Sequence, residues 1–159
     1  MEGIVVRKVT ESDFEQMFEL WGEMQSFHEK WDEKWYKPEQ GCKPKCFDYW
    51  RQKIKEDNSI MLVAEKGGDL AGMIISHIVD RPPVLESQFK VLFIDNVITG
   101  NKYRRAGIFK KLTKVLLELA KEKDVAAINL IVNTENEAAI KAYESLGMEK
   151  KEISMLKYL

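Results

Sequence analysis

Cationic side chains gather at residues 103–111 (YRRAGIFKK), where a single glycine precedes an amphipathic helical pattern. Arg104, Arg105 and Lys110 stand at the start of the expected helix, where the macrodipole favours acidic residues instead. A bound anion would explain these cations, because free backbone N–H groups and basic side chains hold phosphates at helix N-termini. The stretch fits equally well the solvated first turn of a surface helix. Taken alone, it leaves both interpretations open.

Two common nucleotide-binding motifs are absent from the sequence. The first strand–helix unit lacks G-x-G-x-x-G, and residues 103–111 lack both the glycine spacing and the Lys-Ser/Thr pair of a Walker loop. These absences argue against a dinucleotide-binding or P-loop protein.

A second pattern follows at residues 133–148 (NTENEAAIKAYESLGM). Its spacing, N-x-x-A-I-x-x-Y-x-x-x-G, is formed by Asn136, Ala139, Ile140, Tyr143 and Gly147. Joined to residues 91–112 (VLFIDNVITGNKYRRAGIFKKL), it resembles the GNAT superfamily of N-acetyltransferases. In that family a strand leads into R/Q-x-x-G-x-G/A, and N-x-x-A-x-x-x-Y-x-x-x-G-F completes the acyl-CoA site. The resemblance therefore implies acetyl-CoA as co-substrate and an amine as acceptor.

The resemblance assigns the cofactor site position by position. Arg104 and Gly107 match the phosphate loop, whereas Phe109 stands where the family has Gly or Ala. We expect the Phe109 ring to point into the helix–sheet core, away from the pyrophosphate. Met148 replaces the usual Phe, a change of similar volume. The implied cofactor-binding residues are Val97, Ile98, Thr99, Arg104, Arg105, Ala106, Gly107, Ile108, Phe109, Lys110, Asn136 and Tyr143. Of these, Asn136 is equally well explained as a helix N-cap.

Two residues are candidates for proton transfer. By resemblance, Tyr143 gives a proton to the departing thiolate, and a phenol near pKa 10 is close to a thiol near 8.5. The alternative for Tyr143 is a core aromatic residue. Asp95 interrupts an otherwise apolar strand, and some family members carry a glutamate there. It is a candidate base for the ammonium group, a candidate anchor for a cationic substrate, or a solvent-facing carboxylate.

The acceptor site is expected in residues 28–41 (HEKWDEKWYKPEQG) and in a strand hairpin around residues 81–86. Trp31, Trp35 and Tyr36, with the neighbouring carboxylates and Asp95, suit a cationic amine through charge and cation–π contact. The same composition suits a surface loop whose tryptophans pack beneath it. The identity of the amine is not encoded in a readable motif.

The elements that position these residues follow from hydrophobic periodicity and turn residues. We expect strands over 3–9, 60–65, 70–79, 91–99, 126–133 and 152–159, and helices over 10–27, 45–56, 105–123 and 136–146. Early strands are contiguous and late ones alternate with helices, which indicates an α/β fold with a mixed sheet covered by helices on both faces. The resemblance adds that the sheet is mostly antiparallel and that two splayed strands hold the pantetheine arm. One domain over residues 1–159 is expected.

Composition and charge argue against several other classes of protein. A net charge of −1 argues against a nucleic-acid or membrane-surface protein. No apolar run is long enough to span a bilayer, and no signal peptide pattern is found, so a cytoplasmic location is expected. Cys42 and Cys46 lack the further ligands of a zinc site, and we expect no metal. A homodimer through the terminal strand is expected only from the resemblance.

The sequence thus predicts an N-acetyltransferase that moves an acetyl group from acetyl-CoA to a primary amine of a small molecule or peptide. Attack would be direct, in a ternary complex. The competing interpretation is a non-catalytic acyl-CoA-binding regulatory module, which would need neither Tyr143 nor Asp95.

Overall fold

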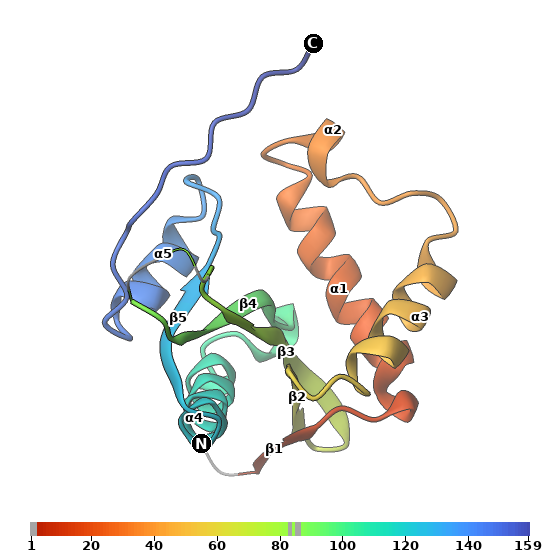
Figure 1. The fold of residues 1–159 in the computed structure, drawn as a ribbon. Helices are drawn as coiled ribbons and strands as arrows, with labels where there is room; N and C mark the ends of the chain where they lie inside the picture. Colours follow the sequence, from red (N-terminus) through yellow and green to blue (C-terminus); the bar gives the residue numbers. More distant parts are fainter. Residues whose placement is uncertain (1–2, 83, 85–86) are drawn as a thin grey trace.

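The computed structural model describes residues 3–82, 84 and 87–159. Its centre is a mixed five-stranded sheet in the order β1-β2-β3-β4-β5 (Figure 1). Strands β1 (Ile4–Lys8), β2 (Ser59–Lys66), β3 (Asp69–Asp80) and β4 (Lys90–Thr99) pair antiparallel, and β5 (Val125–Leu130) pairs parallel with β4. The predicted mixed, mostly antiparallel sheet is confirmed.

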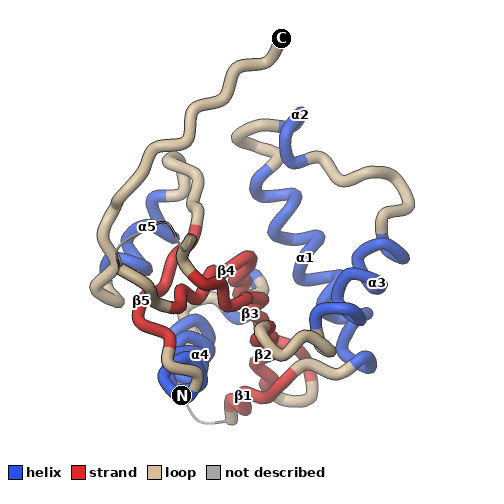
Figure 2. The backbone as a smooth tube through the Cα atoms, viewed as in Figure 1, coloured by secondary structure: helices blue, strands red, loops and turns tan. Residues whose placement is uncertain are grey.

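Helices cover both faces of the sheet, as predicted (Figures 1 and 2). One face packs against α1 (Phe14–His28) and α3 (Lys43–Lys53), with Phe14, Met17 and Trp50 buried against β2 and β3. The other face packs against α4 (Ile108–Glu122), whose buried stripe is Ile108, Leu112, Leu116 and Ala120. These two apolar clusters hold the sheet between the helices.

Helix α4 begins three residues later than the predicted start at Arg105. Arg105 and Gly107 both have left-handed backbones, with φ of 62° and 84°. A left-handed residue cannot continue a right-handed helix, so residues 104–107 form a loop and Gly107 is the N-cap. The cationic stretch therefore lies before the helix as well as in its first turn.

Several further elements differ modestly from expectation, among them β5, which ends at Leu130 instead of at residue 133. The irregular segment 28–41 contains a single helical turn, α2 (Glu33–Tyr36), which begins where the Asp32 carboxylate accepts the Trp35 N–H at 3.0 Å. Helix α5 (Glu137–Glu144) is shorter than the predicted 136–146, because Asn136 is its N-cap and Ser145 is its C-cap.

The predicted terminal strand over 152–159 is wrong. Residues 148–159 form neither helix nor strand and run along the molecule as an extended segment (Figure 2). The alternating apolar residues Ile153 and Met155 suggested a strand, but both are more than 80% exposed, at 86% and 92%. A strand needs a partner edge, which local alternation cannot supply. The expectation of a homodimer through this strand loses its structural basis.

Three residues of the expected acceptor hairpin, Pro83, Leu85 and Glu86, lie outside the described residues. Before them, β3 ends at Asp80, and the Arg81 guanidinium lies 4.8 Å from the centre of the Phe89 ring. Within the described part of the chain, no helix has the length and apolar character needed to cross a bilayer.

Candidate active site

The loop before α4 presents unused backbone donors. The first hydrogen bond of the helix runs from the Lys111 N–H to the Gly107 carbonyl at 3.1 Å. The N–H groups of Ile108, Phe109 and Lys110 therefore have no acceptor within the helix, and no side chain caps them. No acidic residue stands in the first turn. This helix end has the donors and the charge that a phosphate group requires.

The loop conformation has a cost at Arg105. A non-glycine residue in the left-handed region costs about 1–2 kcal/mol relative to the right-handed one. Arg105 (φ 62°) is one such residue, whereas Gly107 adopts the same region freely. Such a conformation persists only where its surroundings impose it, and it is concentrated at ligand-binding sites.

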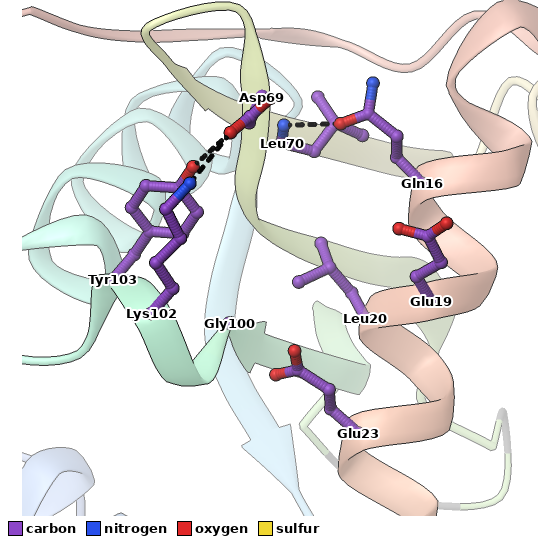
Figure 3. Close-up of a pocket in the computed structure, with 9 residues that line it drawn as sticks. All are labelled: Gln16, Glu19, Leu20, Glu23, Asp69, Leu70, Gly100, Lys102 and Tyr103. Atoms are coloured by element: carbon purple, nitrogen blue, oxygen red, sulfur yellow. Dashed lines mark hydrogen bonds and ion pairs between the residues drawn. The ribbon is translucent and has the colours of Figure 1, made fainter.

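A pocket lined by carboxylates lies between α1 and the residues that lead into this loop (Figure 3). Asp69 accepts hydrogen bonds from the Tyr103 hydroxyl at 2.7 Å and the Lys102 ammonium at 3.1 Å. Across the pocket, a Glu23 carboxylate oxygen accepts the Asn101 N–H at 2.8 Å. The acidic lining makes the pocket unsuitable for a phosphate, and its polar groups fix the chain just before Arg104.

Strands β4 and β5 separate at Asp95. Their last register pair is Ile94 with Leu130, where β5 ends, while β4 continues to Thr99. The residues Val97, Ile98 and Thr99 pair on one side with β3 and have no β5 partner on the other. Ile131, the first residue beyond β5, is 79% exposed. The result is an open strand edge that runs from Asp95 toward the cationic loop.

Asp95 is the extra residue of a β-bulge. In the β3–β4 register Ile75 pairs with Asn96 and Ser76 pairs with Ile94, so Asp95 has no partner. Bulges re-aim a side chain and are common beside active sites. The Asp95 carboxylate contacts His77 of β3, with 2.9 Å between Oδ2 and Nδ1. The pair is partly exposed, at 26% for the histidine and 21% for the aspartate side chain.

Charged and phenolic groups of α3 and the residues after it lie near this pair. Burial, and then the Asp95 charge, raise the pKa of Tyr49, so the phenol stays neutral. The Lys53 ammonium is held by Glu56 at 2.7 Å, and this hydrogen bond raises the pKa of Lys53. Because the Lys53 ammonium is paired with Glu56, the hydrogen-bond partner of the Asp95 carboxylate is His77.

Tyr143 lies on α5 and contacts the first turn of α4. Its ring meets the Phe109 ring edge-on, with 5.8 Å between centroids. Burial raises the pKa of Tyr143 to about 12. Its hydroxyl has no hydrogen-bond partner among the residues that the structure describes. The expected inward turn of Phe109 takes a different form, since the half-buried ring packs on α5 beside the loop instead of joining the sheet core.

Asn136 serves as the N-cap of α5. Its side-chain oxygen accepts the Ala139 N–H at 3.2 Å. The capping alternative raised by the sequence is thus realised in the structure.

Aromatic residues at the end of α1 and in the segment after it form a cluster. Trp31 lies 4.7 Å from the Phe27 ring and 5.2 Å from the His28 ring, and Tyr36 lies 5.0 Å from His28. Burial lowers the pKa of His28, which keeps the imidazole neutral. Trp35, by contrast, is 61% exposed.

The aromatic cluster reaches the cationic loop. The Arg104 guanidinium carbon lies 5.7 Å from the centre of the Phe27 ring. Phe27 was not singled out in the sequence, because its apolar character and helical spacing are those of any core residue. The structure therefore joins the predicted acceptor segment to the predicted phosphate loop.

The described residues contain no group of three or more His, Cys, Asp or Glu side chains that could hold a metal ion. Cys42 and Cys46 are both free thiols. Burial, and then the neighbouring Cys42, raise the pKa of Cys46 to about 11, which makes that thiol a poor nucleophile at neutral pH.

Comparison with known families decides the relationship. The model described as "Acetyltransferase (GNAT) family" matches residues 17–148. The chain belongs to this family. The GNAT match begins at Met17 within α1 and ends at Met148, and it includes the loop before α4, the open edge of β4 and α5.

Relatives of this GNAT chain carry N-acetyltransferase names. It is 27% identical over 154 residues to an uncharacterized N-acetyltransferase of Methanocaldococcus jannaschii, covering 93% of this chain and 62% of that protein. It is 29% identical over 105 residues to human N-acetyltransferase 8, covering 65% of this chain and 44% of that protein. The chain thus spans less than two thirds of the length of these relatives.

Solved structures show the same GNAT fold. A mutant BH1408 protein from Bacillus halodurans has a TM-score of 0.87 at 22% identity, covering 98% of this chain and 99% of that one. Glucosamine-6-phosphate N-acetyltransferase from Arabidopsis thaliana has a TM-score of 0.74 at 24% identity, with 99% of each chain covered. AAC(6')-Iy, in complex with the bisubstrate analogue CoA-S-monomethyl-acetylneamine, has a TM-score of 0.75 at 16% identity, covering 98% of this chain and 97% of that one.

His77 is the residue of the candidate site that no sequence motif of this GNAT chain marks. The available signal was a polar residue in an apolar strand, one strand away from Asp95. Only the register of β3 with β4 shows that the two meet.

Proposed function

We propose that the protein transfers the acetyl group of acetyl-CoA to a primary amine of a small molecule or peptide, by direct attack in a ternary complex. One observation carries this proposal. The edge of β4 left open by β5 begins at the Asp95 bulge and leads to the donor-rich loop before α4. A ligand with a diphosphate at one end, a peptide-like arm and a reactive thioester at the other end matches this sequence of sites.

The co-substrate fits residues of this chain. The free N–H groups of residues 108–110, with Arg104 and Arg105, would hold the diphosphate. The unpaired edge at residues 97–99 would accept the amide groups of the pantetheine arm as a strand does, and Ile131, the first residue after β5, offers an exposed apolar side chain. The backbone of the loop residues Ala106 and Gly107 would approach the phosphates closely. Asn136 would lie beside the arm while it caps α5.

Tyr143 is the proposed proton donor to the sulfur. With its pKa raised to about 12, the phenol stays protonated at every physiological pH, which is the form a donor needs. A thiol titrates near 8.5, so transfer of the phenolic proton to the thiolate is uphill, and it is completed as the second proton of the attacking nitrogen replaces the proton that Tyr143 gives up. An unpartnered hydroxyl is free for this contact.

The acceptor amine is proposed to bind between the aromatic segment and the bulge. Trp31, Tyr36 and the exposed Trp35 would contact its apolar or cationic parts. Asp95 attracts an ammonium group toward the point where the strands separate. A backbone N–H at the open edge would stabilise the oxyanion formed on attack.

The test is release of the CoA thiol from acetyl-CoA across a panel of primary amines, aminoglycosides, amino sugars, polyamines and peptides. Calorimetry with CoA runs in parallel. We expect CoA binding and turnover with at least one amine class, and a decrease in kcat of at least tenfold for Tyr143→Phe. Tight CoA binding without turnover on any amine would favour the regulatory module, and a lack of CoA binding would contradict both.

A further inference from the structure

We propose that His77 is the catalytic base that removes the proton from the acceptor ammonium, and that Asp95 is its positioning residue. This inference rests on the proposed function and assigns the proton acceptor within that same site. It replaces direct proton abstraction by Asp95 with abstraction by the imidazole that the carboxylate holds.

The hydrogen bond between the two residues fixes the histidine tautomer. A carboxylate can only accept, so the 2.9 Å contact requires a hydrogen on His77 Nδ1. The lone pair of the neutral ring is then on Nε2, which leaves that atom as the proton acceptor. The tilted ring contact with Phe93, 5.6 Å between ring centroids, limits rotation of the imidazole.

Chemistry favours the imidazole over the carboxylate as base. An ordinary imidazole titrates near 6.5 and an ordinary aspartate near 3.9, whereas an alkylammonium lies well above both. The stronger base is the more effective acceptor at neutral pH. A carboxylate that already accepts from a histidine ring contributes more by orienting it and stabilising the imidazolium.

The position of the pair fits this role. Asp95 stands at the first β4 residue past the last β4–β5 pair, where the reactive end of the co-substrate is proposed to lie. The bulge turns its side chain, and His77 beside it stays partly open to solvent. Solvent exposure gives the imidazolium a route to release its proton after turnover.

The charged and titratable groups around His77 leave its imidazole available to accept a proton from the substrate. Glu56, whose carboxylate accepts from Lys53, faces the ring from the segment after α3. Tyr49 of α3 is held neutral by burial and by Asp95. Ser59 of β2 and Phe93 of β4, its register partners, bring no charge. Asp95 is thus the carboxylate in hydrogen-bond contact with the ring.

The step balances as follows. The ammonium loses one proton to His77 Nε2, and the freed nitrogen lone pair forms the C–N bond to the acetyl carbon. The C–S bond then breaks with its electron pair on sulfur, which takes the phenolic proton of Tyr143. The second proton of the attacking nitrogen returns to the Tyr143 oxygen. The products are an amide, a thiol and one proton that leaves from His77.

The experiment compares His77→Gln, His77→Ala and Asp95→Asn with the wild type, using the best amine of the panel. Far-UV circular dichroism and the CoA dissociation constant establish that each variant folds and binds. We expect both His77 variants to lose at least about 100-fold in kcat/KM, the usual lower range for a general base. The CoA affinity of each variant should stay within threefold of the wild-type value. We expect Asp95→Asn to lose about tenfold in kcat/KM. Added imidazole should restore at least tenfold to His77→Ala, in proportion to the neutral imidazole present.

The outcomes separate the inference from the proposed function. One outcome would overturn the inference and leave the proposed function intact. In it the wild type turns over amines, the His77 variants keep kcat/KM within threefold of the wild-type value, and Asp95→Asn is inactive. Loss of activity in His77→Ala without any imidazole rescue would also contradict it, because a structural role alone predicts no rescue. A wild type that binds no CoA would overturn both.

Discussion

The Phe109 ring meets the Tyr143 ring edge-on, 5.8 Å between centroids, and so joins the first turn of α4 to α5. Phe109 stands where the family has Gly or Ala, and its ring lies on the α5 side of the loop. An edge-to-face pair is worth about 0.5–1.5 kcal/mol beyond the buried area. The large side chain therefore fixes the phenol proposed to serve the leaving thiolate.

Substitution of Phe109 is expected to act on turnover more than on co-substrate binding. Phe109→Ala removes the ring that holds Tyr143, and we expect kcat to fall about tenfold, which corresponds to about 1.4 kcal/mol. The CoA dissociation constant should change less than threefold, because the backbone donors are retained. Phe109→Leu, which keeps apolar volume, is the matched control and should lose less. An unchanged kcat in Phe109→Ala would refute the positioning role.

Arg104 is expected to supply phosphate affinity. We expect Arg104→Ala to weaken CoA binding about tenfold, or about 1.4 kcal/mol. The dependence of binding on salt should also decrease, because a screened charge contact is lost. Lys121→Ala, in the last turn of α4, is the control and should bind CoA as the wild type does. Calorimetry at two salt concentrations measures both effects.

Arg105 should show opposite effects on stability and binding. Arg105→Gly relieves the left-handed backbone at φ 62°, and we expect the free energy of unfolding to rise by about 0.5 kcal/mol while CoA binding weakens. Arg105→Ala removes the same charge but keeps the Cβ, so its binding should weaken equally without the gain in stability. Urea unfolding and calorimetry distinguish the two variants. Equal stability of the glycine and alanine variants would show that the loop is not strained.

Gly72 lets α4 approach the sheet. A Cβ at this position would lie 2.6 Å from the Ile98 carbonyl oxygen and 2.7 Å from Ile108 Cγ2. Because the first contact is with backbone, we expect Gly72→Ala to lower the free energy of unfolding by about 2 kcal/mol, within the usual cost of overpacking. Gly22→Ala in α1 meets no atom within 4 Å and should raise stability by about 0.5–1 kcal/mol. Urea denaturation compares the pair, and equal effects would contradict the close approach.

The Arg7–Asp13 pair should give stability that depends on pH. Arg7 donates to both Asp13 oxygens at 2.8 Å, and Asp13 is 4% exposed. Burial alone would raise the pKa of Asp13, but hydrogen bonds from Arg7 and Thr10 outweigh it and hold this pKa below its ordinary value. The contribution is therefore fully present above the unfolded-state pKa near 3.9 and is lost as pH falls through the lower folded-state pKa.

We expect Asp13→Asn to lower the free energy of unfolding by about 2 kcal/mol at pH 7, as for other hydrogen bonds to charged groups. The difference in the free energy of unfolding between Asp13→Asn and the wild type should become smaller below pH 4. Glu11→Gln breaks the exposed 3.0 Å pair with Arg51 and should cost less than 1 kcal/mol. Urea unfolding at pH 7 and pH 3 tests this, and a difference that does not change with pH would be incompatible with the pair.

The sequence by itself determined the mixed sheet, the helices α1, α3, α4 and α5, and the glycine-containing loop before α4. Local periodicity predicts α1, α3 and α4, and Gly107 marks the loop, because these features depend on residues close together in the chain. The two motifs at 91–112 and 133–148 identified the family for the same reason.

Only the tertiary structure decided which distant residues meet. The register of β3 with β4, shifted by one residue at the bulge, brings His77 to Asp95, and no local pattern encodes such a shift. The contact of Phe109 with Tyr143 depends on how α5 lies beside α4. The terminal segment shows the converse, since an alternating sequence does not become a strand without an edge to pair with. Pairing and packing between segments far apart in sequence are set by the whole fold, and they position the groups proposed to carry out the chemistry.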